Sequence, residues 1–246
     1  MSLATAVPPH VITQAEAKDR ARAAFGRKAL FDRLSGVFDN AGIARRHIVA
    51  PQEWYGTSHG WRDRNTVYLE AAEDLFVEAA SAAIDKAGLQ PREIDGVVTV
   101  STTGIATPSL DARAAHRVGF RENIRRVPVF GLGCAGGATG LSLAARLAAA
   151  EPGSTVLFVC VELCTLAFRV DEPGKADIVA AALFGDGAAA CVLRAGEAGF
   201  AEVAATGEHT WPDTLDIMGW RVDPQGFGVI FAQAIPPFAR RARSRT

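Results

Sequence analysis

Apolar residues in this chain of 246 residues gather into short runs and into stripes with helical spacing. Short runs rich in β-branched and aromatic residues predict buried strands, whereas apolar residues that repeat every three or four positions predict amphipathic helices. Strands and helices alternate up to about residue 193. This predicts an α/β fold with a mostly parallel sheet that is covered by helices on both faces. Strands are expected at residues 95–101, 127–132, 155–161, 188–193, 200–205 and 227–234.

Capping residues mark where several helices begin and end. The capping box Thr13-Gln-Ala-Glu16 predicts a helix that begins at Gln14. Asn65 or Thr66 is expected to cap a long amphipathic helix that Gly88 closes. Further helices are expected at residues 31–38, 108–115, 138–150 and 175–183, and loops at residues 45–47 and 54–61.

One glycine-rich stretch joins a predicted strand to a predicted helix and contains Cys134. The first turn of a helix carries partial positive charge and unpaired N–H groups, which favour a thiolate over a thiol. We therefore expect the pKa of Cys134 to fall from about 8.5 to roughly 7, which would suit a nucleophile. The structural alternative is that Cys134 is a small buried hydrophobic residue, as free cysteines usually are.

The same stretch also matches a dinucleotide-binding fingerprint. Residues 131–136 read G-x-G-x-x-G, and Glu162 ends the next predicted strand. Two features weaken this match: the unit is internal, and Glu162 lies further along than the roughly 20 residues that the fingerprint requires. A Rossmann-type NAD(P)-dependent oxidoreductase is therefore a second hypothesis.

Composition narrows the class of protein. A net charge of −1 gives no electrostatic footprint for nucleic acid or for an anionic membrane surface. We expect no signal peptide, and the longest apolar run, residues 156–161, is too short to span a bilayer. The histidines have no metal-ligand spacing, so we expect no metal site. The cysteines lie in or beside apolar segments without a C-x-x-C motif, which indicates reduced thiols in the cytoplasm; they are Cys134, Cys160, Cys164 and Cys191.

Several short blocks in a fixed order are more specific than any single motif. They are Ala4–His10, Thr102–Gly104, Gly133–Gly137, Glu162–Arg169, Leu183–Ala189 and Met218–Arg221. Together they resemble the N-terminal half of type III polyketide synthases, the chalcone and stilbene synthase-like branch of the thiolase-fold condensing enzymes. Ketoacyl synthase III enzymes share the Cys-Ala-Gly and Phe-Gly-Asp-Gly blocks, which leaves a condensing enzyme of that type as an alternative.

The resemblance implies a thiolase-like fold, a mixed β-sheet covered by helices. Residues 1–195 would form the N-terminal half with the nucleophile, and residues 196–246 the first strands of the C-terminal half. It also implies an acyltransferase of polyketide biosynthesis, in which a cysteine accepts an acyl group from acyl-CoA. Decarboxylative condensation with malonyl-CoA then extends the acyl group. No metal or organic cofactor is expected, and the full-length form is expected to be a cytoplasmic homodimer that binds neither nucleic acid nor membrane.

The blocks also imply roles for individual residues. Cys134 matches the family's nucleophile. Phe184 matches a gatekeeper phenylalanine between the CoA tunnel and the cavity, and its structural alternative is an ordinary core aromatic. Thr102, Cys164 and Ala167 match positions that line the cavity for initiation and elongation.

Basic residues are expected at the CoA end of the site. Arg33 aligns with one member of a basic cluster in the family, and Arg45 and Arg46 are further candidates. The family's catalytic His and Asn lie in Gly-rich blocks of the C-terminal half, which this sequence does not contain. The sequence therefore resembles a truncated synthase that we expect to be inactive in condensation by itself, and a non-catalytic remnant is a third hypothesis.

Overall fold

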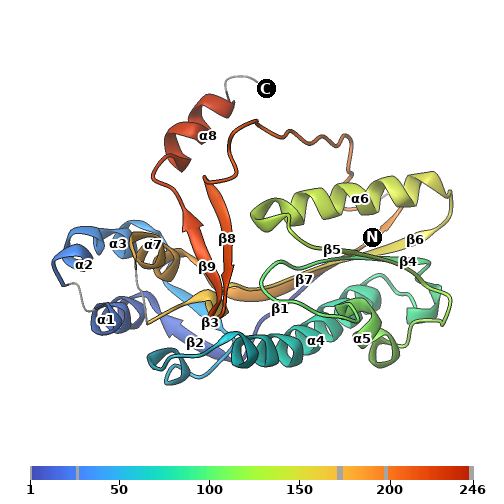
Figure 1. Cartoon of the computed structure of the whole chain (residues 1–246). Helices are drawn as coiled ribbons and strands as arrows, with labels where there is room; N and C mark the ends of the chain where they lie inside the picture. Colours follow the sequence, from blue (N-terminus) through green and yellow to red (C-terminus); the bar gives the residue numbers. More distant parts are fainter. Residues whose placement is uncertain (1, 26–27, 171–173, 197–198, 244–246) are drawn as a thin grey trace. The chain divides into compact units, whose positions relative to one another are not determined.

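The computed structural model describes residues 2–25, 28–170, 174–196 and 199–243 (Figure 1). The chain forms two compact units, each built from segments that are distant in the sequence. Unit 1 comprises Met1–Pro9, Asn65–Leu163 and Asp186–Glu208, and unit 2 comprises His10–Arg64, Cys164–Gly185 and His209–Thr246. None of the helices in the described part of the chain combines the length and the apolar composition that a membrane span requires.

Unit 1 is built on a mixed sheet of five strands in the order β1-β7-β6-β4-β5. Strand β4 pairs in parallel with β5 and with β6, whereas β7 runs antiparallel to both β6 and β1. Four of the five strands therefore point the same way, as the alternation of strands and helices predicts. The strands are β1 Ser2–Ala6, β4 Gly96–Val100, β5 Arg125–Val129, β6 Thr155–Leu163 and β7 Asp186–Arg194.

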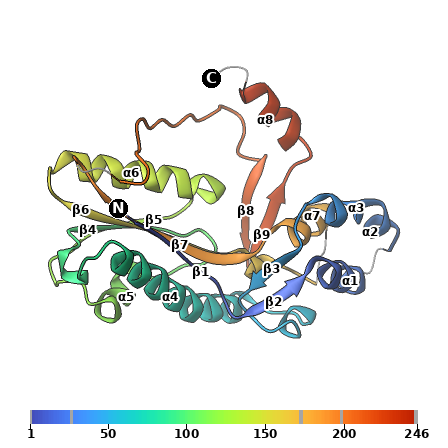
Figure 2. The same cartoon turned by 180° about the vertical axis from the view of Figure 1, so that it is seen from behind.

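Helices cover both faces of this sheet, which confirms the α/β class with a mixed sheet covered by helices. Helix α6 (Gly136–Ala150) lies on one face, and α4 (Trp61–Lys86) and α5 (Leu110–Val118) lie on the other (Figures 1 and 2). On the α6 face, Val98, Val100 and Phe158 of the sheet form a buried cluster with Ala144 and Ala148 of the helix.

Two glycines set the distance between α6 and the sheet. A Cβ at Gly136 would lie 2.6 Å from Cγ1 of Val100, and a Cβ at Gly140 would lie 2.4 Å from Cε2 of Phe158. Real Cβ atoms do not approach other atoms so closely, so only glycine fits at these positions. This close packing fixes the N-terminal end of α6, and Cys134 lies directly before it.

Unit 2 contains two short antiparallel ladders and five helices among its described residues. Its core includes Phe25, Phe31 and Phe38, together with Ile48 and Ile178. The elements are β2 His10–Thr13 paired with β3 Arg45–Ile48, β8 Met218–Asp223 paired with β9 Gly226–Phe231, α1 Gln14–Ala24, α2 Lys28–Leu34, α3 Gly36–Asn40, α7 Lys175–Leu183 and α8 Ile235–Arg243. Single-turn 3₁₀ helices are η1 Trp54–Gly56 and η4 Cys164–Ala167 here, with η2 Pro91–Glu93 and η3 Gly133–Ala135 in unit 1.

Capping residues and apolar patterns predicted several helix and strand boundaries correctly. The Thr13 capping box is present with both of its hydrogen bonds, and α1 begins at Gln14 as predicted. Helix α7 covers the predicted residues 175–183, and the predicted strand at residues 155–161 lies within β6. Gly88, two residues after the end of α4, adopts a left-handed φ of 71°.

Other predictions were wrong. The predicted loop at residues 45–47 is strand β3, because it pairs with β2. Helix α4 begins at Trp61, not at Asn65, and the N–H of Trp61 donates to the carbonyl of Pro224 at 3.1 Å. The predicted helix at residues 31–38 is two helices, α2 and α3, which Ser35 separates.

The end of the chain also differs from the prediction. Residues 200–205 form no strand, since they pair with none of the strands in the described part of the chain; Phe200 is 71% exposed, and Val203 packs against the cluster beneath α6. The predicted strand at residues 227–234 is β9, which ends at Phe231. It pairs with β8, a strand that the apolar pattern did not predict. The alternation in β8 is weak because most of its residues are exposed.

Close packing at Gly140 predicts a stability difference between two glycines of the same helix. Gly140→Ala should lower the free energy of unfolding by about 1–3 kcal/mol, because the new methyl group overlaps Phe158 and Val100. Gly137→Ala is the matched control. Nothing lies within 4 Å of its added Cβ, so the better helix propensity should leave stability unchanged or raise it by up to about 1 kcal/mol. Chemical denaturation measures both, and equal effects would contradict the packing argument.

Candidate functional site

Cys134 lies where the sequence predicts, between the end of β5 and the start of α6. The chain leaves β5 through Gly131 and Gly133, whose φ angles of 93° and 55° are left-handed and favour glycine. Cys134 is the central residue of η3, two residues before the first residue of α6, and it is exposed. An exposed thiol at a turn held by packed glycines is accessible to a substrate.

The expected direction of the Cys134 pKa is wrong. Protein atoms packed around the thiol remove part of its hydration and raise its pKa above the ordinary value, and the negative charge of Glu162 adds to the rise. Its own backbone N–H lowers the pKa but does not outweigh these effects. The helix terminus is therefore insufficient to lower the pKa, because burial of the thiol and the charge of Glu162 both oppose it.

Glu162 is the centre of a hydrogen-bond cluster at the end of β6. Its carboxylate accepts from the backbone N–H of Thr102 at 3.1 Å, from Oγ1 of Thr102 at 2.9 Å and from Oγ1 of Thr103 at 2.8 Å. The N–H of Leu163 donates to Oγ1 of Thr103 at 2.8 Å. Burial raises the pKa of Glu162, and the bonds from both threonines oppose that rise. Glu162 thus fixes the loop after β4.

The Thr102–Gly104 block has a structural explanation in this loop. Thr102 is 3% exposed and directs both of its donors to Glu162. A Cβ at Gly104 would lie 2.1 Å from the ring of Tyr68, so the backbone rests against that ring. The hydroxyl of Tyr68 donates to Oγ of Ser101 at 2.7 Å, and burial raises the pKa of Tyr68.

The remaining cysteines of unit 1 are less reactive than Cys134. Burial raises the pKa of Cys160 to about 12 and that of Cys191 to about 11. The side chains of both residues pack against the cluster beneath α6. These two thiols are therefore protonated at neutral pH and fill space in the core.

The predicted cavity residues Cys164 and Ala167 lie in unit 2, at the two ends of η4. Cys164 is half-buried and Ala167 is buried. Between them, the hydroxyl of Thr165 is 2.6 Å from that of Tyr55. The cavity roles of Cys164 and Ala167 stay predictions.

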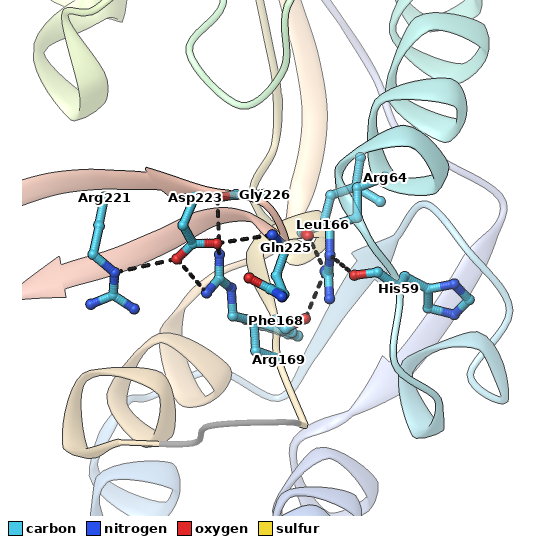
Figure 3. Close-up of polar contacts among 9 residues, drawn as sticks. All are labelled: His59, Arg64, Leu166, Phe168, Arg169, Arg221, Asp223, Gln225 and Gly226. Atoms are coloured by element: carbon cyan, nitrogen blue, oxygen red, sulfur yellow. Dashed lines mark hydrogen bonds and ion pairs between the residues drawn. The ribbon is translucent and has the colours of Figure 1, made fainter.

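The guanidinium group of Arg64 holds the end of η4 (Figure 3). It donates to the carbonyl of Leu166, to that of Phe168 at 2.7 Å and, through Nε, to that of His59 at 2.9 Å. Arg64 is 5% exposed, and its guanidinium lies 5.6 Å from the centre of the Trp54 ring. A buried charge with three carbonyl partners fixes the backbone that carries Ala167.

A second buried arginine ties the next residues to the β8–β9 hairpin (Figure 3). Arg169 donates to both carboxylate oxygens of Asp223, at 2.9 and 2.7 Å, and to the carbonyl of Gly226 at 2.9 Å. Asp223 also accepts from Arg221 at 3.3 Å and from the N–H of Gln225 at 3.0 Å. The hydrogen bonds from Arg169 are the largest cause that holds the pKa of Asp223 well below its usual range.

Phe184 directly follows α7 and is half-buried. Its ring contacts the ring of Phe231 edge-to-face, with centroids 6.4 Å apart. The three predicted CoA-binding arginines also lie in unit 2: Arg33 on α2 and Arg45 on β3 are exposed, whereas Arg46 is 7% exposed. The guanidinium of Arg46 is occupied by backbone carbonyls, so the structure gives it a structural role.

Residues 1–197 match the family model of the N-terminal domain of chalcone and stilbene synthases. The chain belongs to this family. A 1,3,6,8-tetrahydroxynaphthalene synthase from Streptomyces peucetius is 42% identical over 245 residues, which cover 96% of this chain and 64% of the relative. A phloroglucinol synthase from Pseudomonas fluorescens is 31% identical, with 93% and 66% covered. The chain thus spans about two thirds of the length of these relatives.

The fold of this chalcone and stilbene synthase domain agrees with solved structures. The crystal structure of 1,3,6,8-tetrahydroxynaphthalene synthase from Streptomyces coelicolor, a bacterial type III polyketide synthase, superposes with a TM-score of 0.92. The identity is 31%, and the match covers 98% of this chain and 69% of that chain. The thiolase-like fold is therefore confirmed.

The Rossmann hypothesis is wrong. A dinucleotide-binding fold places the strand with the acidic residue next to the strand with the glycine fingerprint. Here β4 lies between β5 and β6, and the Glu162 carboxylate is used by Thr102 and Thr103. The family match also decides against a ketoacyl synthase III enzyme.

Sequence reasoning missed the charged residues that hold the loops. Arg169 stands at the end of the Glu162–Arg169 block, and Asp223 follows the Met218–Arg221 block by two residues. Their opposite charges were a signal that could have suggested a pair. For Arg64, whose described hydrogen bonds to His59, Leu166 and Phe168 go to main-chain carbonyls, the sequence gives no such signal.

The cluster around Glu162 predicts how the reactivity of Cys134 depends on pH. Limiting iodoacetamide should modify Cys134 before Cys160 or Cys191, whose pKa values burial raises further. Glu162→Gln removes a negative charge, so the pKa of Cys134 should fall and its alkylation rate at neutral pH should rise. Peptide mass spectrometry over a pH series measures both quantities. A Cys134 rate profile that Glu162→Gln leaves unchanged would contradict the electrostatic argument.

The Arg169–Asp223 pair predicts that the free energy of unfolding depends on pH. Asp223→Asn should lower the free energy of unfolding by about 1–3 kcal/mol at neutral pH, because it weakens charged hydrogen bonds to a buried guanidinium. Asp223 has a lowered pKa, so the difference from wild type is present above the ordinary aspartate pKa of about 4 and shrinks as the pH falls through the folded-state value.

Arg221→Gln is the matched control for this experiment, because it removes a partner of the same carboxylate. The side chain of Arg221 is 60% exposed, so its loss should cost less than about 1 kcal/mol. Denaturant unfolding at several pH values compares the two variants. Equal costs, or an Asp223→Asn effect that grows in acid, would exclude the buried pair as the stabilising contact.

Proposed function

We propose that the protein is a type III polyketide synthase whose Cys134 accepts an acyl group from acyl-CoA. Condensation with malonyl-CoA then extends the acyl chain. The observation that carries this proposal is an accessible thiol at the glycine-packed junction of β5 and α6, in a chain of the chalcone and stilbene synthase family. The whole reaction is proposed for a protein of the relatives' length, of which this chain spans about two thirds.

Acyl transfer begins with attack of the Cys134 sulfur on the thioester carbonyl. A new carbon–sulfur bond forms, the bond to the CoA sulfur breaks, and the CoA thiolate leaves. Burial and Glu162 raise the pKa of the thiol, so efficient attack needs a cation or base beside the sulfur. The family resemblance assigns this task to the histidine of the C-terminal half, which also serves with the asparagine in decarboxylation.

The roles of the cavity residues follow from the family resemblance. Thr102, Cys164 and Ala167 line the cavity, and Phe184 separates it from the CoA tunnel. Arg33 and Arg45 are exposed, so their guanidinium groups are available for the phosphates of CoA. The reaction uses CoA thioesters as substrates and needs no metal or organic cofactor.

The names of the relatives favour a small polyhydroxylated aromatic product, such as a tetrahydroxynaphthalene or a phloroglucinol. We place the reaction in the cytoplasm, since the cysteines lie in or beside apolar segments without a C-x-x-C motif, which is typical of reduced thiols. The full-length protein is proposed to act as a homodimer.

The test is transfer of a radiolabelled acetyl group from acetyl-CoA to the protein. The label should appear on wild type and on Cys191→Ser, and should be absent from Cys134→Ser, because Cys134 is exposed whereas burial raises the pKa of Cys191 to about 11. Peptide mapping locates the label. A label on Cys160 or Cys164, or none with any acyl-CoA, would refute the proposal and support a non-catalytic remnant.

A further inference from the structure

Arg46 is a buried arginine whose guanidinium group closes the end of helix α7. Its Nη1 donates to the carbonyls of Ala181 at 2.5 Å and of Phe184 at 3.0 Å. Its Nη2 donates to the carbonyl of Ala182 at 2.8 Å and to Oε1 of Gln14. The last carbonyls of a helix have no helical partner and carry partial negative charge, so a guanidinium satisfies and neutralises them together.

A second side chain supports this arrangement. Nε2 of Gln14 donates to the carbonyl of Ala182 at 3.0 Å and to that of Phe38 at 3.1 Å. Gln14 is the first residue of α1, so the start of α1 and strand β3 both bond to the end of α7. We call Arg46, Gln14 and these carbonyls the α7 clamp.

The backbone of Phe184 is hydrogen-bonded on both sides, and one of these bonds comes from the α7 clamp. The N–H of Phe184 donates to the carbonyl of Ala180 at 2.8 Å, and its carbonyl accepts from Arg46. The next residue, Gly185, packs against β3: a Cβ there would lie 3.3 Å from Cβ of Arg46 and 3.4 Å from the carbonyl of His47. Both sides of the Phe184 backbone are therefore held, and its ring direction is set against Phe231.

Closing a helix end with a buried guanidinium has a desolvation cost. Helices commonly end with a left-handed glycine, which needs no charged side chain. Here Phe184 is extended, with φ −83° and ψ 145°, and a charged group is buried instead. Burial lowers the pKa of Arg46, and its Nε atom is buried without a hydrogen-bond partner. The end of α7 therefore depends on a buried charge that bonds the carbonyls of Ala181, Ala182 and Phe184.

The geometry points to Arg46 as a positioning residue for Phe184, and through it as a determinant of which acyl-CoA the protein accepts. This inference rests on the proposed function, in which Phe184 is the gate to the cavity. Arg46 itself touches no substrate in this role. It acts by keeping the Phe184 backbone in one position, so that the ring leaves an opening of fixed size.

The experiment compares loading of Cys134 from acetyl-, hexanoyl- and dodecanoyl-CoA in four proteins. They are wild type, Arg46→Met, Phe184→Ala and the double variant. Arg46→Met should change the ratio of acetyl to dodecanoyl loading at least about fivefold, the factor expected for loss of one net hydrogen bond. In the Phe184→Ala background the same substitution should leave the ratio unchanged, because the residue through which it acts is gone.

Two further variants separate positioning from general destabilisation. Arg46→Lys keeps a cation but not the fork of donors, so it should restore the wild-type ratio only in part. Arg92→Met removes an exposed arginine of unit 1 and should change nothing. If Arg46→Met fails to fold, Gln14→Met removes the other side chain of the α7 clamp and should shift the ratio in the same direction.

Fluorine NMR of 4-fluorophenylalanine at position 184 gives a readout that does not depend on activity. Wild type should give one sharp resonance, and Arg46→Met should give a broadened or split one. If wild type loads no acyl-CoA, the proposed function fails, and a resonance that Arg46→Met leaves unchanged would overturn the positioning role as well. If wild type loads acyl-CoA but Arg46→Met keeps both its ratio and its resonance, the inference is wrong and the function stands.

Discussion

Buried charged side chains that bond to the backbone hold the irregular segments on which the predicted site residues lie. In unit 2, Arg46, Arg64 and Arg169 each donate to main-chain carbonyls. In unit 1, Glu162 accepts from the N–H and the hydroxyl of Thr102. Backbone groups buried outside helices and ladders cost about 1–3 kcal/mol each if they stay unpaired. The charged side chains form hydrogen bonds with these backbone groups and thereby fix each segment in one conformation.

The same constraint shapes the chemistry of Cys134. Burial raises the pKa of the Cys134 thiol, and the negative charge of Glu162, which fixes the loop after β4, raises it further. A site built from this chain alone therefore carries a well-placed but weakly ionised cysteine. A cation beside the sulfur would offset the charge of Glu162 and lower the pKa of the thiol.

Elements with local signals could be predicted from the sequence, and elements that depend on distant partners could not. The cap at Thr13 and the apolar stripe of residues 175–183 define their helices without reference to the rest of the chain. Strand β3 was missed because Arg45 and Arg46 read as a solvated loop, although pairing with β2 turns Arg46 into the core. The position of Cys134 followed from its glycines, whereas its pKa depended on burial and on the charge of Glu162, which no local pattern reveals.

Amide hydrogen exchange at Phe168 and Phe184 tests most directly whether buried arginines fix these segments. The two N–H groups bond to the carbonyls of Thr165 and Ala180. Both should exchange as slowly as the amide of Ile178 inside α7. Arg64→Met should accelerate exchange at Phe168 and not at Phe184, and Arg46→Met should do the reverse. Exchange in the wild-type protein as fast as in the exposed residues 204–210 would contradict the account.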